Sequence, residues 1–312
     1  MSTSGVPSVD EIVKSGIPVF GGEPVRRKPN RRKKAVPYGL ASSGVLWLLV
    51  FFVLPSFYML YVSLSSGLLG TQQFTWQWSN YTSQITEFQS QLIRSLYYAT
   101  VVTALTLVVA YPLAYWIAFY GGRRKNTYLL LLLLPFFVSF IIRTVEWSFI
   151  LADNGFVLGT LKNWGLLPKS FKVLSTATAV IAGMAYNFLP FTALPVYVAL
   201  ERIDPKLLEA GKDLYANPAT VFRKVIWPLS LPGVFAAFLL TFVPAVGDYV
   251  NSALLGGLHT TMIGQIIQSR YLNLDYPRGA ALSFLLMAVL LIGGIAYAKA
   301  LGTEDVLETA AR

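Results

Sequence analysis

The chain has 312 residues, of which 55% are hydrophobic and only 13% are charged, about half the charged share of an average soluble domain. The net charge is +10, there is no cysteine, and the one histidine is His259. This composition argues against histidine-rich metal sites and histidine-based catalytic triads. Long apolar runs indicate an integral membrane protein instead.

Residues 1–37 are polar and rich in Pro and Gly, and they end in seven bases within 26–34. A secretory signal would have a short apolar region and a small-residue cleavage site, and neither is present. We expect a disordered cytoplasmic arm whose charge orients the protein and whose bases can contact anionic lipid head groups. The bases cluster beside apolar spans, so topology explains the net charge better than nucleic-acid binding does.

Six apolar segments are long enough to cross a bilayer core, which needs about 20 helical residues. They cover 40–64, 94–120, 127–151, 174–200, 228–250 and 279–301. Several contain prolines, which membrane helices tolerate when neighbours satisfy the freed carbonyls. The sequence therefore predicts an all-α, six-span membrane domain over 38–302, followed by a short cytoplasmic tail at 303–312.

The distribution of Lys and Arg predicts the orientation of these spans. With the amino terminus inside, 18 of the 25 bases lie on the cytoplasmic side, six lie on the outer side, and Arg143 lies within a span. Both termini are therefore expected in the cytoplasm of a cell whose plasma or inner membrane holds the chain. The polar segment 201–228, between the fourth and fifth spans, is expected on the same side.

Two short helices are predicted within this polar segment. Asp204–Pro205 and Asn217–Pro218 each combine a helix cap with a proline at the first helical position. The first helix is expected over 205–214, with Leu207, Ala210, Gly211 and Leu214 on one face. The periodicity fits equally well a helix that inserts into a partner's groove and an amphipathic helix that lies on lipid.

Residues 209–228, EAGKDLYANPATVFRKVIWP, resemble the EAA loop of ABC importer permeases. Glu209 and Ala210 match that pattern, and Pro228 falls at its twentieth position. Gly211 stands where the pattern has Ala, and Tyr215 stands where it has the Gly that would supply a turn. We expect Asn217–Pro218 to supply the turn instead.

Two further blocks, 227–257 and 261–287, are similar to the polyamine (spermidine and putrescine) branch of these permeases, and to the first of its two paired permeases. The resemblance implies the type I ABC importer permease fold with a cytoplasmic coupling helix. It also implies a second homologous permease subunit, a pair of ATPase subunits and an extracytoplasmic solute-binding protein as partners. The implied coupling residues are Glu209, Ala210, Gly211, Asp213, Leu214, Tyr215 and Pro228.

The same resemblance implies transport by alternating access rather than an enzymatic reaction in this chain. ATP and Mg²⁺ would bind the partner ATPase, and the chain itself has no G-x-x-x-x-G-K-[ST] loop. No cofactor or metal is expected on this subunit. The alternatives are a permease for another small cargo, such as an amino-acid derivative, organic amine or inorganic ion, and an ion-coupled carrier or channel.

Charged side chains inside spans usually face a bundle interior or a pathway. Arg143 and Glu146 in the third span are three residues apart, so they share a helix face and can pair with each other. The alternative is that Glu146 and its neighbour Trp147 line an outer vestibule. A flexible polycation needs carboxylates for its charge and aromatic faces for its ammonium groups.

Two other polar and aromatic pairs are candidates for the pathway. Asp248 and Tyr249 close the fifth span, where a plain interfacial acid is the alternative. Tyr186 and Asn187 lie in the fourth span, where prolines suggest a broken helix and helix packing is the alternative. Five acids near the outer face are matched by six bases, so this subunit alone forms no negative funnel.

Overall fold

The computed structural model describes residues 42–67, 72–213, 215 and 217–300. The chain divides into two units, Met1–Tyr58 and Met59–Arg312. The predictions for Leu214 and for the tails at 1–37 and 303–312 concern residues outside the described ranges.

The first described helix starts at Ser42 and contains a π-helical turn, η1 (Leu49–Val53), before α3 (Leu54–Ser63), whose last five residues belong to the second unit. Pro55 explains this wide turn, because a proline has no N–H to donate to the carbonyl four residues earlier. The N–H of Leu54 donates instead to the carbonyl of Leu49, five residues back. The whole helix is apolar and long enough to cross a membrane, where the sequence predicts the first span.

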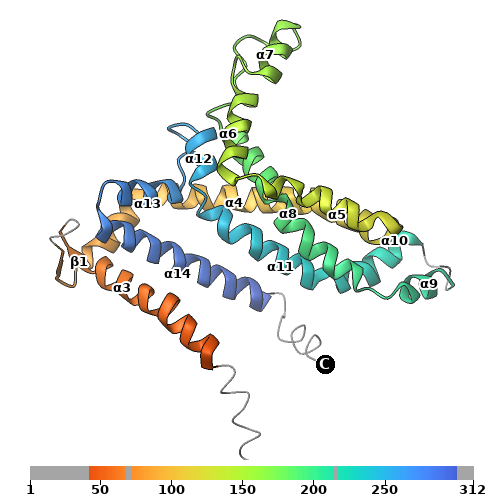
Figure 1. Cartoon of the computed structure of the whole chain (residues 1–312), viewed down its shortest axis with the longest axis horizontal. Helices are drawn as coiled ribbons and strands as arrows, with labels where there is room; N and C mark the ends of the chain where they lie inside the picture. The colour runs from red at the N-terminus through yellow and green to blue at the C-terminus, as the bar shows by residue number, and fades with distance from the viewer. Residues whose placement is uncertain (1–41, 68–71, 214, 216, 301–312) are drawn as a thin grey trace, which may run out of the picture. The chain divides into compact units, whose positions relative to one another are not determined.

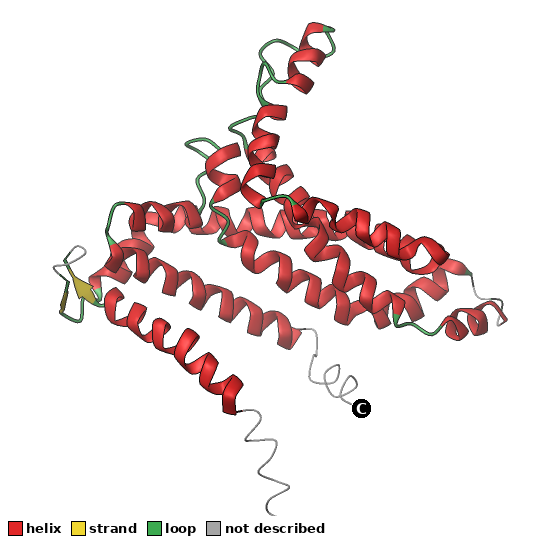
Figure 2. Cartoon of the chain, viewed as in Figure 1, coloured by secondary structure: helices red, strands yellow, loops and turns green. Residues whose placement is uncertain are grey.

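The second unit is almost entirely helical, as Figure 2 shows. It contains one antiparallel strand pair, β1 (Ser65–Ser66) with β2 (Gln73–Phe74), among its described residues. Its helices in chain order are α4 (Ser79–Tyr120), η2 (Gly122–Arg124), α5 (Lys125–Leu133), η3 (Leu134–Phe137), α6 (Phe140–Leu151), α7 (Phe156–Asn163), α8 (Ala177–Glu201), α9 (Pro205–Asp213), α10 (Pro218–Val221), η4 (Phe222–Ile226), α11 (Trp227–Val246), α12 (Val250–Leu255), α13 (Ile263–Leu272) and α14 (Tyr276–Ala300).

Helix α4 is much longer than the span predicted at 94–120. Its first four turns are polar, so an apolar window does not detect them, and the helix bends at Phe88 (φ −115°, ψ 18°). Arg270 holds this bend: its guanidinium lies 5.3 Å from the centroid of the Phe88 ring and 3.3 Å from the carboxylate of Glu87. These two contacts connect the polar first turns of α4 to α13.

The span predicted at 127–151 is not one straight helix. The helices Gly122–Phe137 and Phe140–Asn163 meet at an angle of 86°, and Figure 1 shows α6 and α7 pointing away from the line of α5. Pro135 in η3 has no N–H for a regular helix, and Val138 is extended with ψ 138°. Within the described residues, five helices are long and apolar enough to span a membrane, or six if this bent pair counts as one.

Helices α4, α8 and α11 pack side by side at the centre of the second unit (Figure 1). Gly233 permits the contact between α8 and α11, because a Cβ there would lie 2.3 Å from Ala199 Cβ and 2.7 Å from the Pro195 carbonyl oxygen. Helix α8 runs unbroken through Pro190 and Pro195, so the expectation of a broken helix in this span is wrong.

Candidate functional site

The polar segment between α8 and α11 forms the helices that its cap signals predict. The Asp204 side chain accepts a hydrogen bond from the Lys206 N–H at 2.9 Å, and α9 follows from Pro205. The Asn217 side chain accepts one from the Ala219 N–H at 3.1 Å, and α10 follows from Pro218. The two local starts therefore arise from the same Asx–Pro chemistry.

The inward face of α9 differs from the predicted one. Leu208 packs against the buried cluster around Val221 and Ile226, and a Cβ on Gly211 would lie 2.9 Å from Val221 Cγ2. Leu207, which the sequence places on the packed face, is exposed. Gly211, at a position where the family pattern has Ala, thus allows α9 to lie close against α10.

Tyr215 itself makes the turn after α9. Its φ is +53°, in the left-handed region that costs a non-glycine residue about 1–2 kcal/mol. The tyrosine thus adopts the conformation that the pattern's glycine would, and the Asn217 side chain also turns the chain where it caps α10. The side chain of Tyr215 is 98% exposed.

Pro228 produces a second π-helical turn. Residues Phe222–Ile226 form η4, and the Trp227 N–H donates to the Phe222 carbonyl five residues back. As at Pro55, the proline stands two residues after the wide turn and lacks the N–H that a regular α-turn requires. Helix α10 therefore continues through η4 into α11 without a break.

A cleft of about 350 Å³ lies between the polar segment 201–228, called the coupling segment below after its predicted role, and the adjoining end of α4. Leu208 and Glu209 of α9, Pro218 and Val221 of α10, and three aromatic residues of α4 contribute to its walls. Ala210 and Asp213 are exposed, as is Pro228 further along. The predicted coupling residues within the described ranges therefore form an accessible surface, apart from Gly211, which is half-buried.

Asp248 lies after the end of α11 and is buried, with only 6% of its surface exposed. Its Oδ1 accepts hydrogen bonds from the N–H groups of Val250 and Asn251 at 2.9 and 3.1 Å, and its Oδ2 accepts one from Asn251 Nδ2 at 2.5 Å. Both oxygens thus hold the start of α12. The alternative of an exposed interfacial acid is wrong for Asp248.

A buried polar network continues from Asp248 across three helices. Asn187 Nδ2 of α8 donates to Asn251 Oδ1 of α12 at 3.2 Å and to Thr144 Oγ1 of α6 at 3.0 Å. Asn187 and Asp248 are therefore structural neighbours through Asn251. Tyr249, which follows Asp248 in the sequence, lies elsewhere and lines a separate surface cleft with Tyr271 of α13.

An open groove of about 510 Å³ brings Glu146, Trp147 and Tyr186 together, and it is lined also by Arg143 and by apolar residues of α6 and of the α5–α6 bend. The Trp147 and Tyr186 rings meet edge to face, with centroids 5.4 Å apart. Glu146 is exposed beside them. The groove thus offers one carboxylate and two aromatic rings, which together suit an ammonium group.

Among the five acids that the sequence predicts near the outer face, Glu146 differs in having no partner within the described residues. Glu87, Asp153 and Asp275 form ion pairs with Arg or Lys side chains, and Asp248 is held by its own loop. Glu146 has no hydrogen bond or ion pair within the described part of the chain. The sequence does not separate these five acids, because the pairings depend on α4, α7, α13 and α14 meeting in space.

Arg143 does not pair with Glu146 in the structure, although the spacing allows it. Its guanidinium lies over the rings of Phe136 and Phe140, 5.4 and 5.8 Å from their centroids. Nε and Nη1 are buried and have no hydrogen-bond partner among the residues that the structure describes. The expectation of a self-neutralising Arg143–Glu146 pair is wrong for this conformation.

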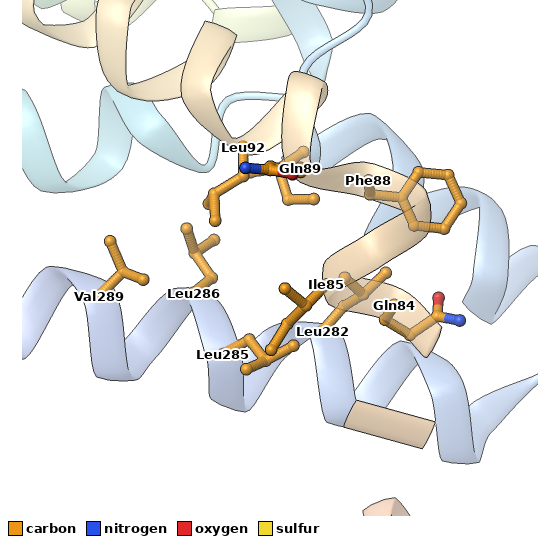
Figure 3. Close-up of a pocket in the computed structure, with 10 residues that line it drawn as sticks. Gln84, Ile85, Phe88, Gln89, Leu92, Leu282, Leu285, Leu286 and Val289 are labelled. Atoms are coloured by element: carbon orange, nitrogen blue, oxygen red, sulfur yellow. The ribbon is translucent and has the colours of Figure 1, made fainter. Parts of the chain in front are cut away.

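A smaller cavity of about 220 Å³ lies between α4 and α14. Figure 3 shows Leu286 and Val289 of α14 opposite Ile85 and Leu92 of α4. Its lining is almost wholly apolar, with Gln84 and Gln89 as the polar members and no charged side chain. This chemistry does not suit a cationic solute.

Comparison with known proteins identifies the type of molecule. A family model, the binding-protein-dependent transport system inner membrane component, matches residues 110–301. The chain belongs to this family. It is 34% identical to the spermidine/putrescine transport system permease protein PotB of Haemophilus influenzae over 78% of this chain and 88% of that protein.

Two further likenesses agree with this family. PotB of Escherichia coli K12 is 32% identical, over 81% of this chain and 94% of that protein. A bacterial ABC transporter involved in the import of alginate has a chain of the same fold, with a TM-score of 0.60 at 17% identity, covering 86% of this chain and 96% of that chain.

The family assigns the chain to the inner membrane as a multi-pass transport component and not as an enzyme. The predicted type I importer permease fold is confirmed by the structural neighbours. In such importers the ATPase is a separate subunit, and the permease works with a partner permease and a binding protein. An ion-coupled carrier is therefore excluded by family membership.

Proposed function

We propose that the chain forms half of the translocation pathway for a polyamine-like cation in an ATP-driven importer. The observation that carries this proposal is the similarity to two spermidine/putrescine permeases over most of their length. ATP and Mg²⁺ bind the partner ATPase pair, and this chain holds neither. An extracytoplasmic solute-binding protein delivers the cargo.

The coupling segment carries the ATPase contact in this proposal. Glu209, Ala210, Asp213 and Tyr215 form the accessible surface of α9 and its turn, which supports a short helix docked in a partner's groove. Gly211 allows α9 to pack closely against α10, and α10 is continuous with η4 and α11. A movement of α9 is therefore transmitted through α10 to the fifth span. The docking free energy must differ between the two ATPase states for ATP to shift the equilibrium.

The pathway surface in this proposal is the groove of Glu146, Trp147 and Tyr186. Asp248 and Asn187 stabilise the helix that carries this groove, because their hydrogen bonds run through Asn251 to Thr144 of α6. Tyr249 belongs to a different cleft. The carboxylate attracts an ammonium group, and the two rings cover its methylene neighbours. Both termini and the coupling segment face the cytoplasm, in keeping with the Lys and Arg bias.

Reconstitution of the complete complex in liposomes tests this function. We expect uptake of radiolabelled spermidine or putrescine that requires ATP, both permeases and the binding protein. Uptake by the purified chain alone along an ion gradient would overturn it. Cargo specificity is tested in the same vesicles by competition with amino-acid derivatives and monoamines, and competition stronger than that of spermidine would reassign the cargo.

A further inference from the structure

Arg143 is a buried cation in the wall of the open groove of about 510 Å³. Only 7% of its surface is exposed, and its guanidinium lies over the rings of Phe136 and Phe140. Nε and Nη1 are enclosed and meet no acceptor in the described chain. The third nitrogen, Nη2, is not among these enclosed atoms and makes no hydrogen bond within the described residues. It is therefore the donor that opens on the groove.

The depth of this cation in the membrane makes an unpaired charge costly. Arg143 lines the groove together with Tyr186, the tenth of the 25 residues of α8. At a rise of 1.5 Å per residue, Tyr186 lies roughly 14 Å from the end of α8 that the charge bias places outside. This is near the middle of a hydrocarbon core of roughly 30 Å. Charged side chains at such a depth usually pair with another group.

The described part of the chain supplies no counter-ion for Arg143. Glu146 is the one acid in the lining of the groove, and the two side chains do not pair. The buried acid Asp248 has both of its oxygens engaged at the start of α12. The two aromatic rings offset part of the cost of the buried charge. An acceptor for Nη2 must therefore come from outside this chain.

The groove continues into an apolar face of α6, the helix that Figure 1 shows leaving the line of α5. Ile142 lines the groove and is exposed, and Ile141 and Phe149 are exposed on the same helix. Lipid tails can cover such side chains, but they bring no acceptor for a guanidinium, and head groups lie too far from the bilayer middle. A protein surface with apolar side chains and one carboxylate matches both features of this face.

We infer that this groove is part of the interface with the partner permease, and that the partner presents a carboxylate to Nη2 of Arg143. Importers of this family contain a partner permease beside the chain. Glu146 stays available to the cargo, because the partner's carboxylate pairs with Arg143, almost one helical turn nearer the α5–α6 bend. The inference goes beyond the proposed function, since it holds for any cargo.

Retention of this chain by an affinity-tagged partner permease measures the contact. The complete complex is purified in detergent with the tag on the partner, and the share of this chain that survives a fixed wash is measured. For Arg143→Met we expect retention to fall at least threefold, because the partner's carboxylate is left buried without a cation. Arg143→Lys keeps the charge and should retain most of the wild-type level. Arg278→Gln removes a half-exposed charge at the start of α14 and should change nothing.

Unfolding of the purified chain without its partner separates an interface role from an internal one. There Arg143 has no counter-ion, so Arg143→Met removes an uncompensated buried charge and should leave the unfolding temperature unchanged or raise it. In the complex the same variant should lower the unfolding temperature. A lower temperature in both samples would overturn the inference, because it would give Arg143 a structural role within this chain.

Unchanged retention of Arg143→Met would also overturn the inference. So would a loss of retention that occurs in nanodiscs containing phosphatidylglycerol and vanishes in pure phosphatidylcholine, since that result makes a lipid head group the acceptor. ATP-dependent spermidine uptake by the wild-type complex is scored separately. Its absence refutes the proposed function and leaves the result on the interface standing.

Discussion

Asp248 follows the end of α11 and Glu146 lies in the middle of α6, and the surroundings of these two carboxylates give them different tasks. Asp248 accepts three hydrogen bonds at the start of α12, so Asp248→Ala leaves buried donors without an acceptor. We expect a loss of roughly 1–3 kcal/mol in folding free energy, with a lower unfolding temperature. Thermal unfolding of the detergent-purified complex, followed by tryptophan fluorescence, measures this change.

Glu146→Gln is the matched comparison, because Glu146 is exposed and makes no hydrogen bond or ion pair in the described chain. Its unfolding temperature should stay at the wild-type value, while spermidine binding to the complex weakens by about tenfold or more, as expected for a lost charge contact. Equal loss of stability in both variants would contradict the separation of roles. Normal cargo binding in Glu146→Gln would remove Glu146 from the pathway.

Tyr215 combines a strained backbone with an exposed ring, and two substitutions separate these features. Tyr215→Ala keeps the left-handed strain and removes the ring, whereas Tyr215→Gly removes both. We expect both variants to reduce co-purification of the ATPase, because the ring stands 98% exposed on the proposed docking surface. Full ATPase recovery with Tyr215→Gly would show that only the turn matters.

At the scale of helices, the contact between α8 and α11 depends on Gly233, which has no side chain. Gly233→Ala places a methyl group 2.3 Å from Ala199 Cβ, so the helices must separate, at a cost of about 1–3 kcal/mol. Gly293→Ala in α14 meets nothing within 4 Å and should be neutral or stabilising by up to about 1 kcal/mol. Unfolding temperatures of the two variants decide this, and equal values would contradict the close approach.

The helical elements follow from the sequence wherever a local signal controls them. Apolar length predicts the spans, and the Asx–Pro pairs predict the starts of α9 and α10. Local signals fail where the outcome depends on neighbouring structure: Pro135 contributes to an 86° bend, whereas Pro190 and Pro195 leave α8 intact. A proline removes one hydrogen bond in every case, and packing on both sides decides whether the helix continues.

The candidate site was only partly predictable for the same reason. The sequence identifies Glu146, Trp147, Tyr186 and Asp248 as unusual, because polar residues within apolar spans are expensive. It does not show that Tyr186 meets Trp147 or that Asp248 is enclosed by its own loop, since these contacts join distant segments. The resemblance to a family narrows the function, but only the contacts separate a structural acid from an accessible one.

At the scale of the whole molecule, the orientation in the membrane has a direct chemical test, because the chain contains no cysteine. Tyr215→Cys and Leu258→Cys each introduce a single thiol at a position that is 98% or 94% exposed in the native side chain. The charge bias puts the first in the cytoplasm and the second on the outer face. A membrane-impermeant maleimide should therefore label Leu258→Cys in intact spheroplasts and label Tyr215→Cys only after permeabilisation.

The cysteine-free parent controls for background labelling. Labelling of Tyr215→Cys in intact cells would invert the topology, and it would also remove the coupling segment from the reach of a cytoplasmic ATPase.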